Sequence, residues 1–453
     1  MKKIVTMLLV VVMVLGLAAC GSKTTTETKA PTEAKVDTPA TEAETDAPAA
    51  AGSVYYLNFK PEFDQALQGL AASYTEKTGV PVKVVTAASG DYSNTLNAQM
   101  GKDGAPTVYN IGNMSGLKDW DEYALDLTGT ALAGELATND FNLYNEAGEL
   151  KAMGYCYESF GIIVNTKLLA DAGHSLDEIK DFASLKAVAD DIHARAAELG
   201  FDAFSSAGLD GSSSWRFSGH LANMPLYYEF RDDGVTEQPA EIKGTYLDNF
   251  RNIWDLYITD SAADPTALST ATGDQSEAEF GEGKAVFYQN GTWEDAALTA
   301  DKFNLNPDEI AMIPIYCGVD GEEKAGLCSG TENCWAINSQ AKEEDIQASL
   351  DFLYWLVTDP DASAVLVEQL GAVPFKSCPA SANKFIVDGN ALLADGKYAV
   401  TWAFNYTPNV DSWRATVVTA LAAYSADPTD ANWEAVKTAF VDGWAIEYKT
   451  VNG

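Results

Sequence analysis

The chain has few basic residues, few histidines and no motif for a metal, and each shortage excludes a class of function. Only 29 Lys and Arg stand against 66 Asp and Glu, which gives a net charge of −37. A surface this acidic repels phosphate backbones, which argues against nucleic acid as a partner. The three His are scattered without the spacing of zinc ligands. We therefore expect neither a metal nor a cofactor.

Cysteine is scarce as well. The chain has six Cys and no C-x-x-C pattern, and five of them follow Cys20. Because five is odd, at least one of these has no partner within the chain. We expect free buried thiols, with Cys317–Cys328 or Cys328–Cys334 as the alternative bridges.

Beyond the N-terminus there is no apolar run long enough to span a bilayer. At the N-terminus, Lys2 and Lys3 precede an apolar stretch over 4–17, and two Ala then lead to Cys20. This pattern predicts a signal peptide over 1–19. The Cys directly after small residues resembles the lipobox of bacterial lipoproteins, which implies that Cys20 becomes the first residue and carries lipid. The alternative is an ordinary signal peptide with a coincidental Cys.

Residues 20–52 are predicted to tether the folded part to this lipid. The segment is rich in Thr, Ala, Glu and Pro and contains no aromatic residue, so it cannot offset the entropy of ordering the chain. A flexible coil of this length reaches about 30 Å. The signal, lipid and tether together predict a protein anchored at the extracellular face of the cell membrane.

The folded part begins near residue 54 with alternating strand and helix patterns. We expect strands over 54–57, 82–85 and 107–111, and helices over 63–74 and 92–100. Such alternation is typical of an α/β fold with a largely parallel sheet covered by helices. Ligands of these sheets lie beyond the carboxyl ends of the strands, which makes residues 58–60 and 112–113 candidates for binding.

Four segments together resemble the extracellular solute-binding lipoproteins of bacterial ABC transporters, carbohydrate type. They read Ala-Pro-Thr-Val, Val-Asn-Thr-Lys-Leu-Leu, Phe-Gly-Glu-Gly-Lys-Ala-Val-Phe followed by Asn-Gly-Thr-Trp, and Leu-Val-Thr-Asp-Pro followed by Gly-Ala-Val-Pro. They stand at 105–108, 164–169, 280–293 and 356–374. Thr107 replaces the usual Asp and Val164 the usual Tyr of the family pattern.

The resemblance implies two α/β lobes that close on a ligand about a hinge. By analogy, lobe 1 takes residues 53–162 and 314–358, and lobe 2 takes residues 163–313 and 359–453. The implied partners are a carbohydrate and the permease subunits in the membrane, and we expect a monomer.

A sugar ring offers C–H groups on one face and hydroxyls around its edge. Aromatic faces pack against the former, and carboxylates, amides and basic side chains bind the latter. Trp293 follows a predicted strand and a turn at Gly291, and Trp215 lies in a Gly/Ser-rich loop. Trp254 has the helical pattern of a core residue. The candidate ligand-binding residues are Lys60, Glu62, Asn113, Glu158, Trp215, Asn290, Trp293, Trp335, Phe404 and Asp411.

Several of these candidates have a structural alternative. Glu62 suits a helix start, where a negative charge is favoured. Trp335 precedes a predicted strand and could be buried in the sheet, and Trp293 could serve packing alone.

The sequence favours a non-enzymatic receptor that captures a carbohydrate, of oligosaccharide size, and delivers it to a permease. One alternative is a secreted, lipid-anchored glycoside hydrolase, which needs two carboxyl groups at a defined separation, and no pair stands out among 66 acids. A second alternative keeps the fold and binds a peptide or a polyamine.

Overall fold

The computed structural model describes residues 52–87, 89–205, 208–261, 263–331 and 333–453, all within one compact unit, Ala50–Gly453. The predicted signal peptide 1–19, the lipidation site Cys20 and the tether up to residue 51 lie outside the described residues. Within the described residues, none of the helices is both long enough and apolar enough to cross a membrane.

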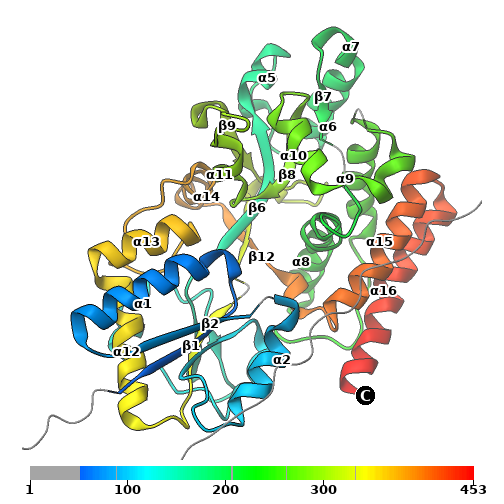
Figure 1. The fold of residues 1–453 in the computed structure, drawn as a ribbon. Helices are drawn as coiled ribbons and strands as arrows, with labels where there is room; N and C mark the ends of the chain where they lie inside the picture. Colours follow the sequence, from blue (N-terminus) through cyan, green and yellow to red (C-terminus); the bar gives the residue numbers. More distant parts are fainter. Residues whose placement is uncertain (1–51, 88, 206–207, 262, 332) are drawn as a thin grey trace, which may run out of the picture. The chain divides into compact units, whose positions relative to one another are not determined.

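Two mixed sheets organise the described part of the chain (Figure 1). The first contains β1 Val54–Asn58, β2 Val82–Thr86, β3 Val108–Ile111, β4 Leu143–Tyr144, β5 Leu150–Gly154 and β11 Cys334–Ile337. Its strand order is β2-β1-β3-β11-β5-β4. Only the pairs of β1 with β2 and with β3 are parallel.

The second sheet contains β6 Glu158–Asn165, β7 Asp202–Phe204, β8 Ala285–Gly291, β9 Ile310–Ile313, β10 Ala325–Gly330 and β12 Tyr398–Thr401. Its order is β12-β10-β6-β8-β7, and β9 also pairs with β6. β6 is antiparallel to β8, β9 and β10, whereas β7–β8 and β10–β12 are parallel pairs.

Helices cover both sheets. Those packed with the first sheet are α1 Asp64–Thr78, α2 Ser89–Met100, α3 Met114–Trp120, α4 Ala131–Gly134, α12 Glu343–Thr358 and α13 Pro360–Leu370. Those packed with the second are α5 Thr166–Asp171, α6 Phe182–Ala194, α7 Ala196–Leu199, α8 Ala222–Asp233, α9 Leu247–Thr259, α10 Gly273–Gly281, α11 Glu294–Thr299, α14 Lys384–Ala394, α15 Val410–Ala426 and α16 Asp430–Asn452.

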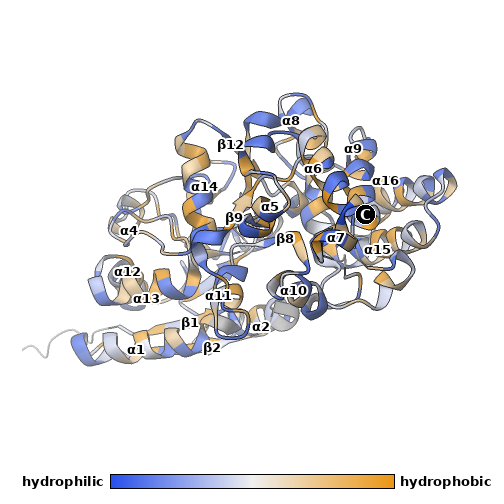
Figure 2. Ribbon diagram, turned by 90° about the horizontal axis from the view of Figure 1, so that it is seen from above, coloured by the Kyte–Doolittle hydropathy of each residue, from blue (hydrophilic) through white to orange (hydrophobic). Residues whose placement is uncertain are grey.

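Short helical turns complete the structure. They are the 3₁₀ turns η1 Pro61–Phe63, η2 Leu176–Glu178, η4 Pro265–Thr270, η5 Pro307–Glu309, η6 Glu322–Lys324 and η7 Ala403–Tyr406, and the π-helical turn η3 Arg216–Leu221. Figure 2 shows β8 and β9 as hydrophobic segments, whereas α1 alternates between hydrophilic and hydrophobic residues. This contrast is expected when strands are covered and a helix exposes one side to water.

The α/β fold and the first elements agree with the sequence prediction. The strand and helix predicted over 54–57 and 63–74 are β1 and α1, and α1 ends at Gly79, whose φ of 77° favours glycine. The expectation of a largely parallel sheet is wrong. β11 enters the first sheet from the second and runs antiparallel to β3 and β5, and β6 runs antiparallel to β8, β9 and β10.

The chain passes between the two sheets at several points. It leaves the first sheet between Gly154 and Glu158, and it returns between Gly330 and Cys334. α13 and Phe375 pack in the core of the first sheet, while Phe385 packs with the second. The lobe boundaries at 162, 314 and 358 stay a prediction. By sheet and core membership we would now place the crossings at Tyr157, between Gly330 and Cys334, and between Cys378 and Phe385.

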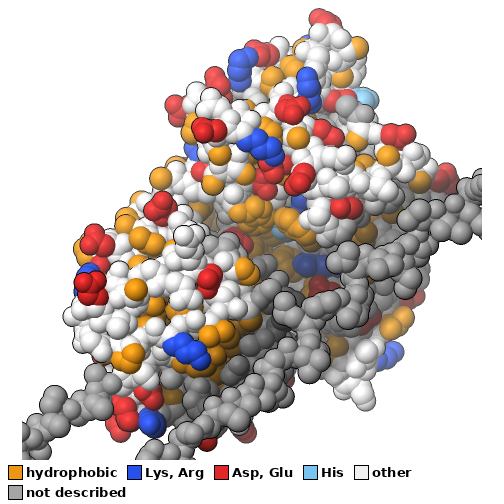
Figure 3. Space-filling model, in the orientation of Figure 1, with side chains coloured by type: hydrophobic (Ala, Val, Ile, Leu, Met, Phe, Trp, Pro, Cys, Tyr) orange, Lys and Arg blue, Asp and Glu red, His pale blue; other side chains and the backbone are white. Residues whose placement is uncertain are grey.

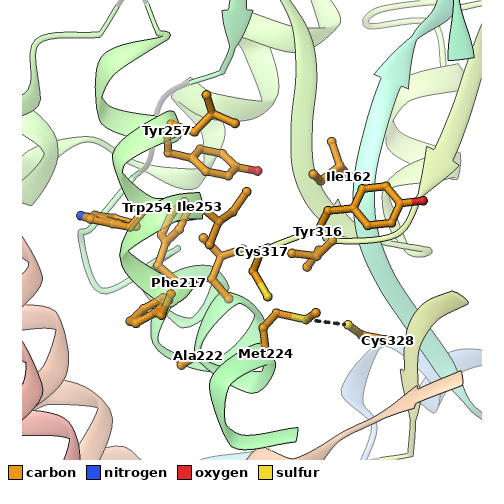
Figure 4. Packing of buried hydrophobic residues seen from close by; sticks show 14 of the residues in the cluster. Ile162, Phe217, Ala222, Met224, Ile253, Trp254, Tyr257, Tyr316, Cys317 and Cys328 are labelled. Carbon is orange, nitrogen blue, oxygen red and sulfur yellow. Dashed lines mark hydrogen bonds between the residues drawn. The ribbon is translucent and has the colours of Figure 1, made fainter. Parts of the chain in front are cut away.

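The expectation of free thiols is confirmed for the cysteines that the structure describes. None of the five forms a disulfide, four are buried and Cys378 is half-buried. Cys328 donates its thiol hydrogen to Met224 Sδ at 3.6 Å, within a cluster that also contains Cys317 (Figure 4). Neither Cys317–Cys328 nor Cys328–Cys334 forms a bridge. Burial raises the pKa of the Cys328 thiol, so this sulfur is a packing group rather than a nucleophile.

Candidate functional site

Four rings meet where β6 begins, and we call Phe160, Trp215, His220 and Trp293 the aromatic cluster. The Phe160 and His220 rings stack with centroids 3.8 Å apart. The Trp215 and Trp293 rings lie 4.9 and 5.6 Å from His220, and 5.9 Å from each other. Trp293 is 37% exposed, so its indole is available to a ligand while its neighbours hold it in place.

Two glycines allow the close approach of these rings. A Cβ atom on Gly291 would lie 2.1 Å from the Trp293 ring, and one on Gly330 would lie 2.5 Å from the Trp402 ring. Trp402 stacks on Phe160 and on Phe404, with centroids 5.7 and 5.4 Å apart. Trp402 and Phe404 therefore extend the aromatic cluster toward η7, although both are buried.

His220 is an uncharged member of the aromatic cluster. It lies in the π-helical turn η3, where Gln289 Nε2 donates to its Nδ1 at 2.9 Å. Burial, with the positive charges of Arg414 and Arg216, holds the pKa of His220 well below its ordinary value. At neutral pH its imidazole is therefore a flat neutral ring that supports the two tryptophans.

A buried arginine lies behind the aromatic cluster. Arg216 is 1% exposed, and its Nε donates to the Gln289 carbonyl oxygen at 2.8 Å. Its guanidinium lies 4.8 Å from the Tyr288 ring and 4.9 Å from the Phe217 ring. Among the described residues, its two terminal nitrogens have no hydrogen-bond partner. Arg216 thus carries a positive charge directly beneath the site.

Asn290 and Glu294 form a polar pair beside Trp293. Asn290 Nδ2 donates to Tyr288 Oη at 2.6 Å and to Glu294 Oε1 at 2.8 Å. Asn290 is buried next to the last residue of β8, and Glu294 begins α11. The predicted site residue Asn290 therefore fixes the turn that carries Trp293.

Glu294 makes the stability of the folded protein depend on pH. Burial and the charge of Glu277 raise its pKa to about 7, against the opposing effect of Arg216. Between the unfolded pKa near 4.5 and the folded value, the folded state binds more protons, so this group's contribution to stability falls as the pH rises. We expect Glu294→Gln to match the wild-type melting temperature at pH 5 and to exceed it at pH 8.

Thermal melts at pH 5, 6, 7 and 8 check this expectation. The matched control is Glu309→Gln, which removes an exposed carboxylate from η5, just before β9 of the second sheet. The assignment of the raised pKa to Glu294 is refuted if the Glu294→Gln and wild-type melting temperatures stay a constant distance apart across this range.

An ion pair joins the loop after β1 to the first residue of β6. Lys60 Nζ lies 3.0 Å from Glu158 Oε1, and the Lys60 side chain is 5% exposed. Glu158 is two residues before Phe160 and pairs with Gly330 in the β6–β10 ladder. The two predicted residues Lys60 and Glu158 therefore lie together, next to the aromatic cluster. Figure 3 shows hydrophobic and basic side chains gathered in a recess at the centre of this face.

The structure shows no contact between the aromatic cluster and the described side chains of the other predicted residues. Asn113 is the N-cap of α3, where its Oδ1 accepts from the Gly116 amide at 2.9 Å. Trp335 is fully buried in the core of the first sheet. Asp411 is exposed in the first turn of α15. Glu62 lies in η1, and its side chain is outside the described residues. No contact in the structure tests a ligand role for Asn113, Asp411 or Glu62.

Trp335 needs a correction because it lies within a strand rather than before one. Its indole stacks on Tyr155, with centroids 4.6 Å apart, and its Nε1 donates to Tyr56 Oη at 2.7 Å. With no exposed surface and its one polar atom satisfied, Trp335 has the environment of a packing residue. We drop it from the proposed contacts.

Sequence reasoning missed Phe160, His220, Arg216 and Arg414. Arg216 and His220 follow Trp215 by one and five residues, so the Gly/Ser-rich loop could have drawn attention to them. Arg414 approaches across η3, where a Cβ atom on Gly219 would lie 2.9 Å from its guanidinium. Nothing in the spacing indicates that contact. No group of three or more metal-ligating side chains occurs among the described residues.

Comparison with known proteins identifies the family. Residues 69–390 match the sequence profile of the bacterial extracellular solute-binding proteins. The chain belongs to this family. A solute-binding protein of this kind is a receptor outside the cell rather than an enzyme, in agreement with the sequence prediction. The search of curated proteins found no match.

Solved structures share the fold at low identity. The solute-binding protein RafE in complex with raffinose is 17% identical, with a TM-score of 0.67 over 88% of this chain and 99% of its own. A chitin oligosaccharide binding protein is 15% identical, with a TM-score of 0.65 over 89% and 100%. A sugar transporter from Bacillus licheniformis in complex with stachyose is 14% identical, with a TM-score of 0.61 over 87% and 100%. The predicted fold is thereby confirmed.

Proposed function

We propose that this solute-binding protein captures a neutral oligosaccharide outside the cell and delivers it to the permease of an ABC importer. The observation that carries the proposal is the exposed Trp293, which is supported from behind by the neutral ring of His220. A rigid apolar ring with polar groups beside it suits a sugar, which packs its C–H face and donates and accepts through its hydroxyls.

The charges near the aromatic cluster support a neutral ligand. Lys60 and Glu158 neutralise each other, and Glu294 lies near the buried Arg216. A strongly anionic or cationic solute would need an unbalanced charge of the opposite sign at the site. The raffinose, stachyose and chitin-oligosaccharide neighbours support the same ligand class.

Capture works by closure in this proposal. The ligand first stacks on Trp293, and lobe closure then brings the Lys60 side of the site onto it, which buries the sugar. The closed form docks on the permease. Lipid on Cys20 and the tether that follows keep the receptor near the membrane. Cys20→Ala tests this anchor, because the variant should leave the detergent phase in which the native full-length chain partitions.

The alternatives fit the site less well. A glycoside hydrolase needs a free carboxylic acid and a carboxylate across the bond to be cleaved. Near the aromatic cluster, Glu158 is paired with Lys60, and Glu294 accepts a hydrogen bond from Asn290. The family is one of binding proteins. A peptide and a polyamine are included as alternative ligands in the test below.

Thermal melts with a ligand panel test the proposal. The panel contains raffinose, stachyose, maltotriose, xylotriose and chitotriose, with spermidine and a tripeptide as the other arms. A bound sugar at a hundredfold excess over its Kd should stabilise the protein by about 2.7 kcal/mol. We expect one of the sugars to raise the melting temperature and to stay intact after long incubation. New reducing ends, or a shift with spermidine or the tripeptide alone, would contradict the proposal.

A further inference from the structure

A pocket separate from the aromatic cluster lies at the carboxyl edge of the first sheet. β1 is flanked by β2 on one side and β3 on the other, both parallel to it. α1, which follows β1, packs in one core of this sheet, and α2 and α3 pack in another. The connection after β1 leads to β2 on one side of it, and the connection after β2 leads to β3 on the other side. The loops that follow β1 and β3 therefore turn to opposite faces of the sheet and leave a crevice between them. Asn110 Oδ1 spans it by accepting from the Phe59 amide at 3.1 Å.

This crevice opens into a pocket of about 640 Å³ beside α2 and α3. The volume falls within the range of small-molecule sites, roughly 300–1,000 Å³. Four aromatic residues line it, namely Phe59, Tyr92, Trp120 and Tyr123. They form two edge-to-face pairs from different elements: the Phe59 and Tyr92 centroids are 5.4 Å apart, and those of Trp120 and Tyr123 are 5.5 Å apart.

The polar groups of the pocket are uncharged except for one carboxylate. Besides the hydroxyls of its two tyrosines, the polar side chains of its lining are Ser93, Asn97, Asn110, Asp119 and Asn333, and no Lys or Arg of the described residues lines it. Such a lining provides no positive charge for an anion. It provides amides and a carboxylate, the groups that bind hydroxyls.

Asn333 is one of two lining residues whose bonding is incomplete, the other being Asn110. It is 2% exposed, and its Nδ2, like that of Asn110, has no hydrogen-bond partner among the described residues. Buried amide nitrogens are almost always satisfied, by protein, by ordered water or by a ligand. A ligand hydroxyl in the pocket is an acceptor of the right chemistry for this donor.

The pocket adjoins the site already described. Phe59 precedes Lys60, which pairs with Glu158. Asn333 comes three residues after Gly330, whose ladder partner is Glu158. The same two segments of chain thus contribute to the pocket and to the ion pair beside the aromatic cluster.

We propose that this pocket is a separate subsite that receives the end of the oligosaccharide and so sets the preferred chain length. The inference rests on the proposed function. The sugar that stacks on Trp293 is one part of the ligand, and a further glycosyl unit enters between the Phe59–Tyr92 and Trp120–Tyr123 pairs. Trp120 packs its ring against that unit, and Asn333 donates to one of its hydroxyls.

Calorimetric titration with sugars of increasing length tests the subsite. The series are sucrose, raffinose and stachyose, and the maltooligosaccharides from two to five units. We expect Trp120→Ala to weaken the longest sugar that the wild type binds about tenfold, and to leave the shortest bound sugar within twofold. Asp119→Ala, at an exposed lining residue, should act in the same direction without any risk to folding. Trp355→Ala is the control, because this half-buried tryptophan lies outside both sites.

The outcomes separate the two proposals. If the wild type binds a sugar and both Trp120→Ala and Asp119→Ala keep its affinities at every length, the subsite is refuted and the proposed function stands. If the wild type binds no sugar of either series or of the thermal panel, the proposed function fails and the subsite fails with it.

Discussion

Trp293→Ala should weaken the binding of the captured oligosaccharide about thirtyfold. The indole is the exposed member of the aromatic cluster, and its stacking on a sugar ring is expected to contribute about 2 kcal/mol, by analogy with stacking on bases. Removing it leaves Trp215 and His220 without the ring that faces the ligand. Isothermal titration of the variant and the wild type with the best sugar of the panel measures the change.

The fold should survive this substitution. Trp293 is more than one-third exposed, so its loss opens no closed cavity, and the melting temperature without ligand should change little. Gly291→Ala is a second way to displace the same ring, because the new Cβ atom would overlap it. Wild-type affinity in Trp293→Ala would remove the aromatic cluster from the ligand site.

Trp335→Ala should have the opposite profile, with a loss of stability of about 3–5 kcal/mol. This indole is fully buried, between Tyr155 and Phe375 at centroid distances of 4.6 and 5.8 Å. Its removal leaves a large cavity and takes away the donor that bonds to Tyr56 Oη. Sugar affinity under native conditions should stay within twofold of the wild type.

Urea denaturation of the ligand-free protein measures the loss of stability, and titration of the folded variant measures affinity. Trp335→Phe, which keeps an aromatic ring in the cavity, should recover part of the stability. A Trp335→Ala variant that unfolds at the wild-type urea concentration but binds sugar poorly would restore Trp335 to the ligand site.

The contrast between these two tryptophans shows what the sequence could predict. Trp293 comes two residues after β8, whose last residues are Asn290 and Gly291, so the predicted strand correctly indicates a residue at the end of a sheet. Trp335 belongs to β11, in which Trp335 and Ile337 enter one core and Cys334 and Ala336 the other. Side chains alternate between the two faces of a strand, and the sequence of this strand shows apolar residues on both faces. Extending the strand by two residues would have placed Trp335 in the core.

The remaining features depend on contacts between distant segments. Strands β1 to β3 and helix α1 follow from local periodicity and are predicted within a few residues. The antiparallel pairing of β6 with β10 joins residues about 170 positions apart, and no local pattern encodes it. His220 and Arg216 lie in the π-helical turn η3, and both form hydrogen bonds with Gln289, which belongs to the distant strand β8.

The central claim is that a neutral sugar binds on the aromatic cluster, and a crystal structure of the protein with the best sugar of the panel tests it most directly. We expect one intact glycosyl ring with its C–H face on the Trp293 indole, close to Trp215, and hydroxyls within hydrogen-bond distance of Lys60 or Glu158. A sugar bound elsewhere, with the Trp293 ring still exposed to solvent, would contradict the account.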